Sequence, residues 1–317
     1  HRLCAAPCFK GIPMTTHLPI SGVFCAAATP ITADDVPDHA SFADHCKALL
    51  EEGCDGIALL GTTGEANSFS IAERKSILEK ITASGVPADV LLPGTGHTSV
   101  GDTVELTRHA VEMGVKGVVL LPPFYYKGVS DEGLFRSYAK VIEGVGSDDL
   151  RIVLYHIPPI ANVPISHALI ARLSEAFPEI VVGIKDSSGK LESMLELAKA
   201  FPGFSVLAGA DPFMLPLLRA GGAGCITSSS NLIAADLRIV FDGWNDPAKA
   251  DEVEAAQQRI GTWRNLTNSY VQLPTVKAML ARRRGNKDWR HVRAPLVGLD
   301  AAQCEDVWAQ MAQLESL

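Results

Sequence analysis

Short runs of apolar residues alternate along the chain with longer stretches in which apolar and polar positions recur at helical spacing. A run that is apolar on both of its alternating faces suits a strand that is covered on both sides, as in a parallel sheet. Periodicity alone does not separate a short buried strand from a helix segment, but flanking glycine and proline residues favour strands. Eight such runs occur, at residues 22–30, 56–61, 89–94, 117–123, 151–158, 180–185, 204–209 and 223–229.

The stretches between these runs carry the signals of helix starts and stops. Residues 70–85 open with Ser70 and Glu73, which form a Ser-x-x-Glu capping box, and close on a glycine. Residues 99–114 and 130–144 repeat the same arrangement of a leading serine and a closing glycine. An alternation of strand and helix that repeats eight times predicts an α/β fold, namely a (β/α)8 TIM barrel.

The alternative to a barrel is a doubly wound open sheet. That fold needs a glycine-rich phosphate fingerprint in its first strand-to-helix turn, and none stands there. After residue 243 the strand pattern stops, and three helical stretches follow at 246–266, 273–285 and 300–317. We therefore expect a catalytic barrel at 19–243 and a C-terminal helical region at 244–317. Residues 1–18 are expected to be an N-terminal extension that is non-native or disordered, with Met14 a candidate start.

Composition and charge exclude several classes of function. The 317 residues are 47% hydrophobic and 20% charged, with a formal net charge of −8, so no basic surface for nucleic acid is expected. No apolar run reaches the roughly 18 residues that span a membrane. Seven cysteines without CxxC spacing predict neither disulfides nor a metal site, and indicate a reducing, cytoplasmic location.

The ends of the predicted strands hold the candidate chemistry, because catalytic groups of a barrel lie at the carboxyl ends of its strands. Lys185 ends the sixth run, in "GIKDSSG". Loss of hydration there disfavours the charged ammonium, and a neutral amine is a nucleophile that forms a Schiff base with a ketone. The alternative is a structural lysine that reaches solvent or pairs with Asp186.

Tyr155 stands near the end of the preceding run, so its hydroxyl can approach the Lys185 amine and transfer the protons that imine formation requires. Its alternative role is structural, as a cap of the core. The turn "GTTGE" at 61–65 offers two hydroxyls and closely spaced N–H groups that suit a carboxylate. Glu65 in that turn is interpreted as a residue that favours a helix N-terminus.

Two further patterns complete the set of candidates. The loop "PPFYYKG" at 122–128 holds three aromatic residues in a chain that is only 6% aromatic. Such a loop is explained by packing or by a contact with a second subunit. No HExxH or GxSxG motif occurs, so neither a catalytic metal nor a serine hydrolase is expected.

Five motifs in order along the chain resemble those of the dihydrodipicolinate synthase and N-acetylneuraminate lyase family. They are "GTTGE", "PPFYYKGVSDEGL", "LYHIP", "GIKDSSG" and "AGADPFMLPLLRAGGAGCITSSSN", and the resemblance covers residues 19–300. It implies that Lys185 forms a Schiff base with pyruvate or another 2-oxo acid, without a cofactor, and that Tyr155 is the general acid and base. It implies a proton relay in which Thr62 contacts Tyr155 and Tyr126 arrives from an adjacent subunit.

The resemblance also implies the residues that bind substrate. Thr63 and the turn amides around Gly61 would hold the pyruvate carboxylate, and the main chain near Ile226 would line the pyruvate pocket. Asp211 and Ser228 match positions at which sialic acid lyases bind sugar hydroxyls.

Two departures from the family pattern concern the second substrate. In dihydrodipicolinate synthases an arginine two residues after the "YNVP" strand end binds the second carboxylate, whereas "YHIPPI" places Ile160 there. His156 replaces the usual asparagine, and Pro212 replaces an acidic residue. We therefore expect a second-substrate pocket that is more apolar than in either founding member.

The sequence thus predicts a carbon–carbon lyase, a Schiff-base aldolase that joins or separates a 2-oxo acid and an aldehyde. The alternatives are a 2-keto-3-deoxy sugar acid dehydratase with the same lysine imine, an authentic 4-hydroxy-tetrahydrodipicolinate synthase, and a non-enzymatic barrel that binds 2-oxo acids as a sensor or scaffold. The role implied for Tyr126 requires a homo-oligomer, a dimer or a dimer-based tetramer. Neither nucleic acid nor a membrane is an expected partner.

Overall fold

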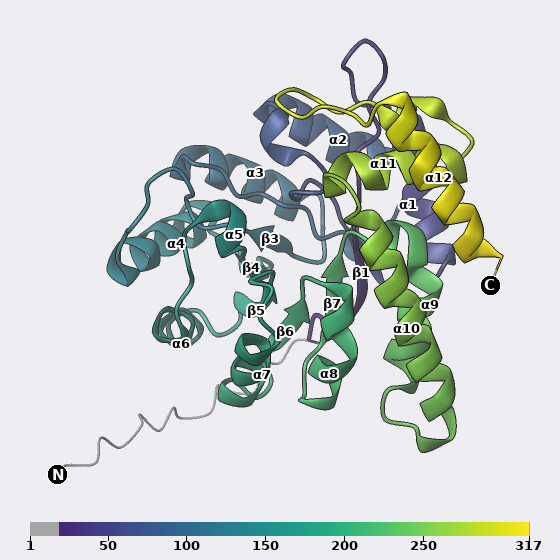
Figure 1. The fold of residues 1–317 in the computed structure, drawn as a ribbon. Coiled ribbons are helices and arrows are strands. Elements are labelled where there is room, and N and C mark those ends of the chain that lie inside the picture. The colour runs from purple at the N-terminus through teal and green to yellow at the C-terminus, as the bar shows by residue number, and fades with distance from the viewer. Residues whose placement is uncertain (1–18, 317) are drawn as a thin grey trace.

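The structure, a computed structural model, describes residues 19–316 of the chain. In this range the strands form one parallel sheet in the order β2-β1-β7-β6-β5-β4-β3 (Figure 1). The predicted N-terminal extension, residues 1–18, lies outside the described residues. The strands are β1 (Gly22–Ala26), β2 (Gly56–Ala58), β3 (Val118–Leu120), β4 (Ile152–His156), β5 (Val181–Asp186), β6 (Ser205–Ala208) and β7 (Gly224–Thr227).

The gap between β2 and β3 is closed by the segment for which the sequence predicts a regular third strand, residues 89–94. It begins as a 3₁₀ turn and then makes two isolated parallel bridges, Ile57 with Leu91 and Gly94 with Val119. Pro93 lacks an N–H group, so this segment cannot form a continuous ladder with both neighbours. The Pro93 carbonyl nevertheless accepts a hydrogen bond from Val119 N at 3.0 Å. The barrel prediction is confirmed, and this prediction of a regular strand is wrong.

Helices cover the outside of the sheet (Figure 1). Those that follow the strands in turn are α1 (His39–Glu51), α2 (Ile71–Ala83), α3 (Val100–Glu112), α4 (Asp131–Val145), α5 (Pro158–Ala161), α6 (His167–Ala176), α7 (Leu191–Ala200), α8 (Met214–Arg219) and α9 (Ser230–Gly243). The C-terminal helices are α10 (Ala250–Thr267), α11 (Gln272–Arg283) and α12 (Ala301–Glu315). No helix within residues 19–316 has the length and apolar character needed to cross a membrane.

The predicted helix starts are confirmed by their capping contacts. The Ser70 side chain accepts from the Glu73 backbone N–H, and the Glu73 carboxylate accepts from the Ser70 backbone N–H, which completes the capping box of α2. At α3 and α4 only the serine half of this contact is present: the Ser99 side chain accepts from Asp102 N, and the Ser130 side chain accepts from Gly133 N. Gly146 ends α4 with φ of 64°, a conformation that glycine adopts without steric cost.

Two hydrophobic layers result from this arrangement. The larger one lies between the sheet and the helices, and the smaller one fills the inside of the barrel. The inner layer contains Phe24, Val153, Leu207 and Ile226, and it also contains Tyr155. The candidate acid–base residue therefore stands on the packed interior of the barrel and not on its helical side.

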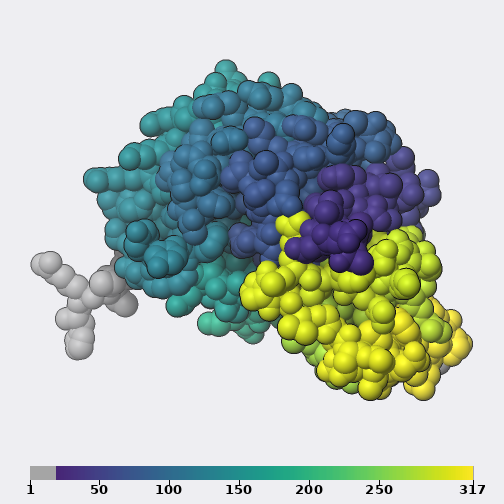
Figure 2. All heavy atoms as spheres, turned by 90° about the horizontal axis from the view of Figure 1, so that it is seen from above, coloured from purple at the N-terminus to yellow at the C-terminus, as the bar shows by residue number. Residues whose placement is uncertain are grey.

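The C-terminal helices lie against one side of the barrel. In Figure 1 α10 lies along α9, and in Figure 2 the yellow C-terminal residues lie beside the purple residues near the start of the described chain. Arg293 makes part of this contact, because its guanidinium pairs with Glu73 at 2.6 Å and with Asp35 at 3.3 Å. The Arg293 contact holds the pKa of Glu73 at about 2. The division of the chain at residue 243 stays a prediction.

A buried ion pair joins this C-terminal region to the "GTTGE" turn. The Lys277 ammonium of α11 lies 2.6 Å from the Glu65 carboxylate, and both side chains are fully buried. The second carboxylate oxygen accepts the backbone N–H of Arg293 at 2.8 Å. Burial lowers the pKa of Lys277, and the Glu65 carboxylate opposes that shift. Glu65 stands at the start of the 3₁₀ turn that follows it, as predicted, but its side chain makes no cap contact there and pairs with Lys277 instead.

Replacement of Lys277 by methionine is expected to destabilise the fold by about 3–5 kcal/mol, because it leaves the Glu65 carboxylate buried without its counter-charge. Urea denaturation followed by circular dichroism measures the loss. The control is Lys75→Met, which removes an exposed pair with Glu105 and should cost less than about 1 kcal/mol. Equal denaturation midpoints for the two variants would contradict the structural role of the buried pair.

Candidate active site

A cavity of ≈ 210 Å³ opens at the carboxyl ends of the barrel strands. Parallel strands deliver the residues that follow them to one rim, which is why sites of this fold form there. The cavity is lined from the turn after β2, from β4, β5 and β7 and from the C-terminal helices, including Thr62, Thr63, Tyr155, Lys185, Ser228 and Arg264.

Lys185 lies in β5 directly opposite Tyr155 of β4 in the strand register. Its side chain is only 5% exposed, and its Nζ atom lies 4.2 Å from the centre of the Tyr155 ring. A cation over the face of a tyrosine ring is stabilised by the ring's negative potential. Within the described residues no carboxylate lies within ion-pair distance of Lys185.

The alternative in which Lys185 pairs with Asp186 is therefore wrong. Successive side chains of a strand point to opposite faces, so Lys185 enters the barrel while Asp186 faces the helices. The Asp186 carboxylate instead accepts from Ser188 N at 2.7 Å and from the Ser193 hydroxyl at 3.4 Å. Lys185 is left without an acidic partner at the cavity.

The "GTTGE" turn brings a hydroxyl to Tyr155. Thr62 Oγ1 lies 3.2 Å from Tyr155 Oη, a hydrogen bond in which either oxygen can be the donor. Both ends of the turn are left-handed, with φ of 57° at Leu60 and 56° at Glu65. This reversal, together with the buried Lys277–Glu65 pair, holds Thr62 beside the phenol. Gly61, the first residue of the turn, lines a smaller hollow of ≈ 20 Å³ together with Thr62, Tyr155 and Arg74.

The remaining candidate substrate residues divide into two groups. Thr63, Ile226, Ser228 and Ile160 line the cavity, and Ile160 is 65% exposed at its rim. His156 does not line it and lies on the helical face of β4. Its Nδ1 accepts the backbone N–H of Ile165 at 3.1 Å, and burial lowers its pKa. The structure thus gives no support to direct substrate contact by His156.

Asp211 also lies behind the cavity wall instead of lining it. Its side chain is fully buried, and neither carboxylate oxygen has a hydrogen-bond partner. The nearest cation is Arg264, whose Nη1 lies 3.5 Å from Asp211 Oδ2. The carboxylate thus faces the protein's own arginine, and contact between Asp211 and sugar hydroxyls stays a prediction.

Tyr126 lies on the surface of the chain, 72% exposed, as does Tyr125. The two rings are perpendicular, with their centres 5.3 Å apart. Lys127 fixes the loop, because its ammonium donates to the Ala161 carbonyl at 2.8 Å and to the Phe124 carbonyl. Tyr126 does not line the cavity of its own chain.

Among the cavity residues that sequence reasoning missed, two come from the C-terminal helices: Arg264 of α10 and Gln272 at the start of α11. Both come from the C-terminal helices, far in sequence from every barrel strand end. Arg264 has the sequence context of an ordinary surface arginine on an amphipathic helix. Only the docking of α10 on the barrel, which no local pattern specifies, places it over the ends of β6 and β7.

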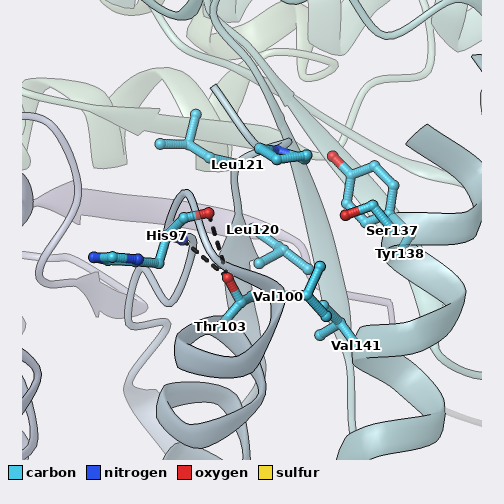
Figure 3. Close-up of a pocket in the computed structure, with 9 residues that line it drawn as sticks. His97, Val100, Thr103, Leu120, Leu121, Ser137, Tyr138 and Val141 are labelled. Carbon is cyan, nitrogen blue, oxygen red and sulfur yellow. Dashed lines mark hydrogen bonds between the residues drawn. The ribbon is translucent and has the colours of Figure 1, made fainter. Parts of the chain in front are cut away.

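A separate, smaller hollow of ≈ 10 Å³ is lined by residues of α3, α4 and the end of β3 (Figure 3). It has room for about one water molecule. The Tyr138 hydroxyl beside it is buried without a hydrogen-bond partner. The His97 ring points away from Tyr138, and its Nδ1 lies 3.2 Å from Asp102. No group of three or more His, Cys, Asp or Glu side chains in the described range is arranged to hold a metal ion.

Comparison with known proteins identifies the family to which the chain is similar. Residues 19–314 match the model of the Dihydrodipicolinate synthetase family. An uncharacterized DapA-like lyase of Chloroflexus aurantiacus is 34% identical over 260 residues, which are 82% of this chain and 85% of that protein. The 4-hydroxy-tetrahydrodipicolinate synthase of Methanothrix thermoacetophila is 30% identical over 298 residues, 92% of this chain and 97% of that protein.

Solved structures agree with the sequence matches. Dihydrodipicolinate synthase from Agrobacterium tumefaciens superposes with a TM-score of 0.82 at 30% identity, covering 92% of this chain and 99% of that one. YagE of E. coli K12, solved in complex with pyruvate, superposes with a TM-score of 0.84 at 26% identity, covering 93% and 99%. With nearly all of its described residues matched in sequence and in fold, the chain belongs to the dihydrodipicolinate synthetase family.

Proposed function

We propose that this protein is a Schiff-base lyase that forms or cleaves the carbon–carbon bond between pyruvate, or another 2-oxo acid, and an aldehyde. The observation that carries the proposal is the grouping of Lys185, Tyr155 and Thr62 in one cavity. The amine lies over the phenol ring at 4.2 Å, and the phenol is hydrogen-bonded to the threonine at 3.2 Å. The pyruvate-bound relative YagE supports the choice of the 2-oxo acid.

The first step is imine formation at Lys185. The neutral amine attacks the keto carbon of the 2-oxo acid, the adduct loses its hydroxyl as water, and a protonated C=N bond remains. Tyr155 supplies and removes the protons, and Thr62 holds the phenol in position. The Tyr155 ring face that lies against the ammonium can equally stabilise the positive iminium. Thr63 lines the same cavity, and we propose that it holds the substrate carboxylate together with the amides of its turn.

The second step breaks or forms the carbon–carbon bond. In the cleavage direction the hydroxyl on carbon 4 loses its proton, the bond between carbons 3 and 4 breaks, and its electron pair moves into the iminium. The aldehyde leaves, the resulting enamine takes up a proton on carbon 3, and water releases the 2-oxo acid from Lys185. A dehydratase would use the same imine, but carbon 3 would lose a proton and carbon 4 its hydroxyl, which together leave as water. An authentic dihydrodipicolinate synthase would have to bind its second substrate without an arginine at Ile160.

Borohydride reduction in the presence of pyruvate is expected to attach a stable adduct to Lys185, because reduction converts the imine into a secondary amine. Peptide mass spectrometry locates the modified residue. Lys185→Arg should abolish the adduct. The exposed neighbour Lys190 provides the control, since Lys190→Arg should leave the adduct intact. An adduct on another lysine, or none with the native protein, would refute the proposal and favour a binding protein.

Replacement of Tyr155 by phenylalanine is expected to lower kcat by about 10²- to 10⁴-fold, because it removes the proton-transfer group while keeping the ring over Lys185. Pyruvate release from a cleavable 4-hydroxy-2-oxo acid measures the rate. Tyr138→Phe is the matched control, since its buried hydroxyl has no hydrogen-bond partner and lies outside the cavity. A Tyr155→Phe enzyme that keeps the native rate would reduce Tyr155 to a structural residue.

We propose further that the protein is a homo-oligomer in which Tyr126 of one subunit completes the relay of the next. Two observations support this role. The Tyr125 and Tyr126 rings are largely exposed on a loop that Lys127 holds in place, and a hollow of ≈ 20 Å³ lies beside Thr62 and Tyr155. A phenol from a neighbouring subunit could extend the hydrogen-bonded chain from Tyr155 through Thr62.

Tyr126→Phe is expected to lower kcat by about 10-fold or more while KM for the 2-oxo acid changes little, because proton transfer and not binding is impaired. Tyr125→Phe, on the same loop and equally exposed, is the control. Analytical ultracentrifugation should show an assembly larger than one chain for both variants. A fully active monomer, or equal losses in the two variants, would rule out the relay role of Tyr126.

A further inference from the structure

Arg264 contributes a cation to the cavity from outside the barrel. It lies in the last turns of α10, with 20% of its side chain exposed. Its Nη1 donates to Ser228 Oγ at 3.2 Å, which ties the guanidinium to the end of β7. With its amide oxygen turned toward Arg264, Gln272 accepts from Nη1 at 2.9 Å and from Nη2 at 3.1 Å. These contacts fix the guanidinium at the cavity wall.

Asp211 balances this cation without occupying its donors. The carboxylate lies 3.5 Å away, and neither of its oxygens forms a hydrogen bond. Because a guanidinium carries five N–H groups, Arg264 keeps donors free for a ligand after its contacts with Ser228 and Gln272. Asp211 therefore acts as a counter-charge that makes a partly buried arginine tolerable, and not as a competing ligand.

The charges that line the cavity are all of one sign. Lys185 and Arg264 are its ionic lining residues, and no aspartate or glutamate is among the side chains that surround it. Under the proposed function, Lys185 together with the turn at Thr62 and Thr63 engages the 2-oxo acid. A second, separate cation at Arg264 is then available for a second anionic group.

We propose that Arg264 binds a carboxylate at the end of the aldehyde substrate, so that the product of aldol addition is a dicarboxylic 4-hydroxy-2-oxo acid. This inference rests on the proposed function and adds the class of the second substrate. A planar guanidinium binds a carboxylate through paired, charge-assisted hydrogen bonds. The proposed role of Arg264 also revises the expectation of an apolar second-substrate pocket. The residue at the family's arginine position, Ile160, is apolar, but a cation reaches the cavity from α10 instead.

The experiment measures aldol addition of pyruvate to glyoxylate and to succinic semialdehyde, each against its uncharged methyl ester. The native enzyme should favour the acids over the esters. Arg264→Gln should lower kcat/KM for the acids by roughly 10- to 100-fold, the effect of losing a charge-assisted hydrogen bond, and should change the esters less than about 3-fold. Arg264→Lys should restore part of the preference. Arg259→Gln is the control, because Arg259 lies on the same helix and pairs with Asp236.

The readouts separate this inference from the proposed function. Borohydride trapping of the pyruvate imine should be unchanged in Arg264→Gln, and absence of the imine in the native enzyme would defeat the proposed function itself. An imine that forms normally, with equal losses for acids and esters or a preference for glyceraldehyde, would overturn the role of Arg264. If Arg264→Gln unfolds because Asp211 is left unpaired, the double variant Arg264→Gln, Asp211→Asn removes both charges and should show the same selective loss.

Discussion

The site depends on the buried ion pair between Glu65 and Lys277. It anchors a turn whose two ends are both left-handed, and that turn holds Thr62 against Tyr155. The Tyr155 ring in turn forms the surface on which the Lys185 amine lies. Two charges buried from water are stable only with each other, so the reactive groups are aligned by an interaction that itself never meets substrate.

The sequence was sufficient for the barrel and for the groups at the strand ends. Lys185 and Tyr155 follow from the rule that parallel strands present their carboxyl ends at one edge, because that rule needs only strand boundaries. The same rule does not identify residues whose roles depend on how the C-terminal helices pack against the barrel. Arg264 reaches the cavity through the packing of α10, and Glu65 finds its partner 212 positions away in α11.

Side-chain direction decided which polar residues near the strand ends reach the cavity. His156 and Asp186 follow inward-facing residues by one position, and alternation along a strand turns both toward the helices. Asp211 stands after β6 but lies behind the wall, where a cation from α10 was not foreseeable. The expectation of an apolar second pocket rested on the departures at Ile160, His156 and Pro212, and it left this cation out.

The origin of Arg264 has a consequence for how proteins of this architecture can diversify. The groups that activate the 2-oxo acid come from the strands and their turns. Arg264, which we propose binds the aldehyde substrate, comes from a helix that follows the last strand. Substitutions in α10 can therefore retune selectivity while the shared covalent chemistry stays intact. The residues that set the reaction type and those that set the substrate range thus lie in different parts of the sequence, so substitutions can accumulate in one part without altering the other.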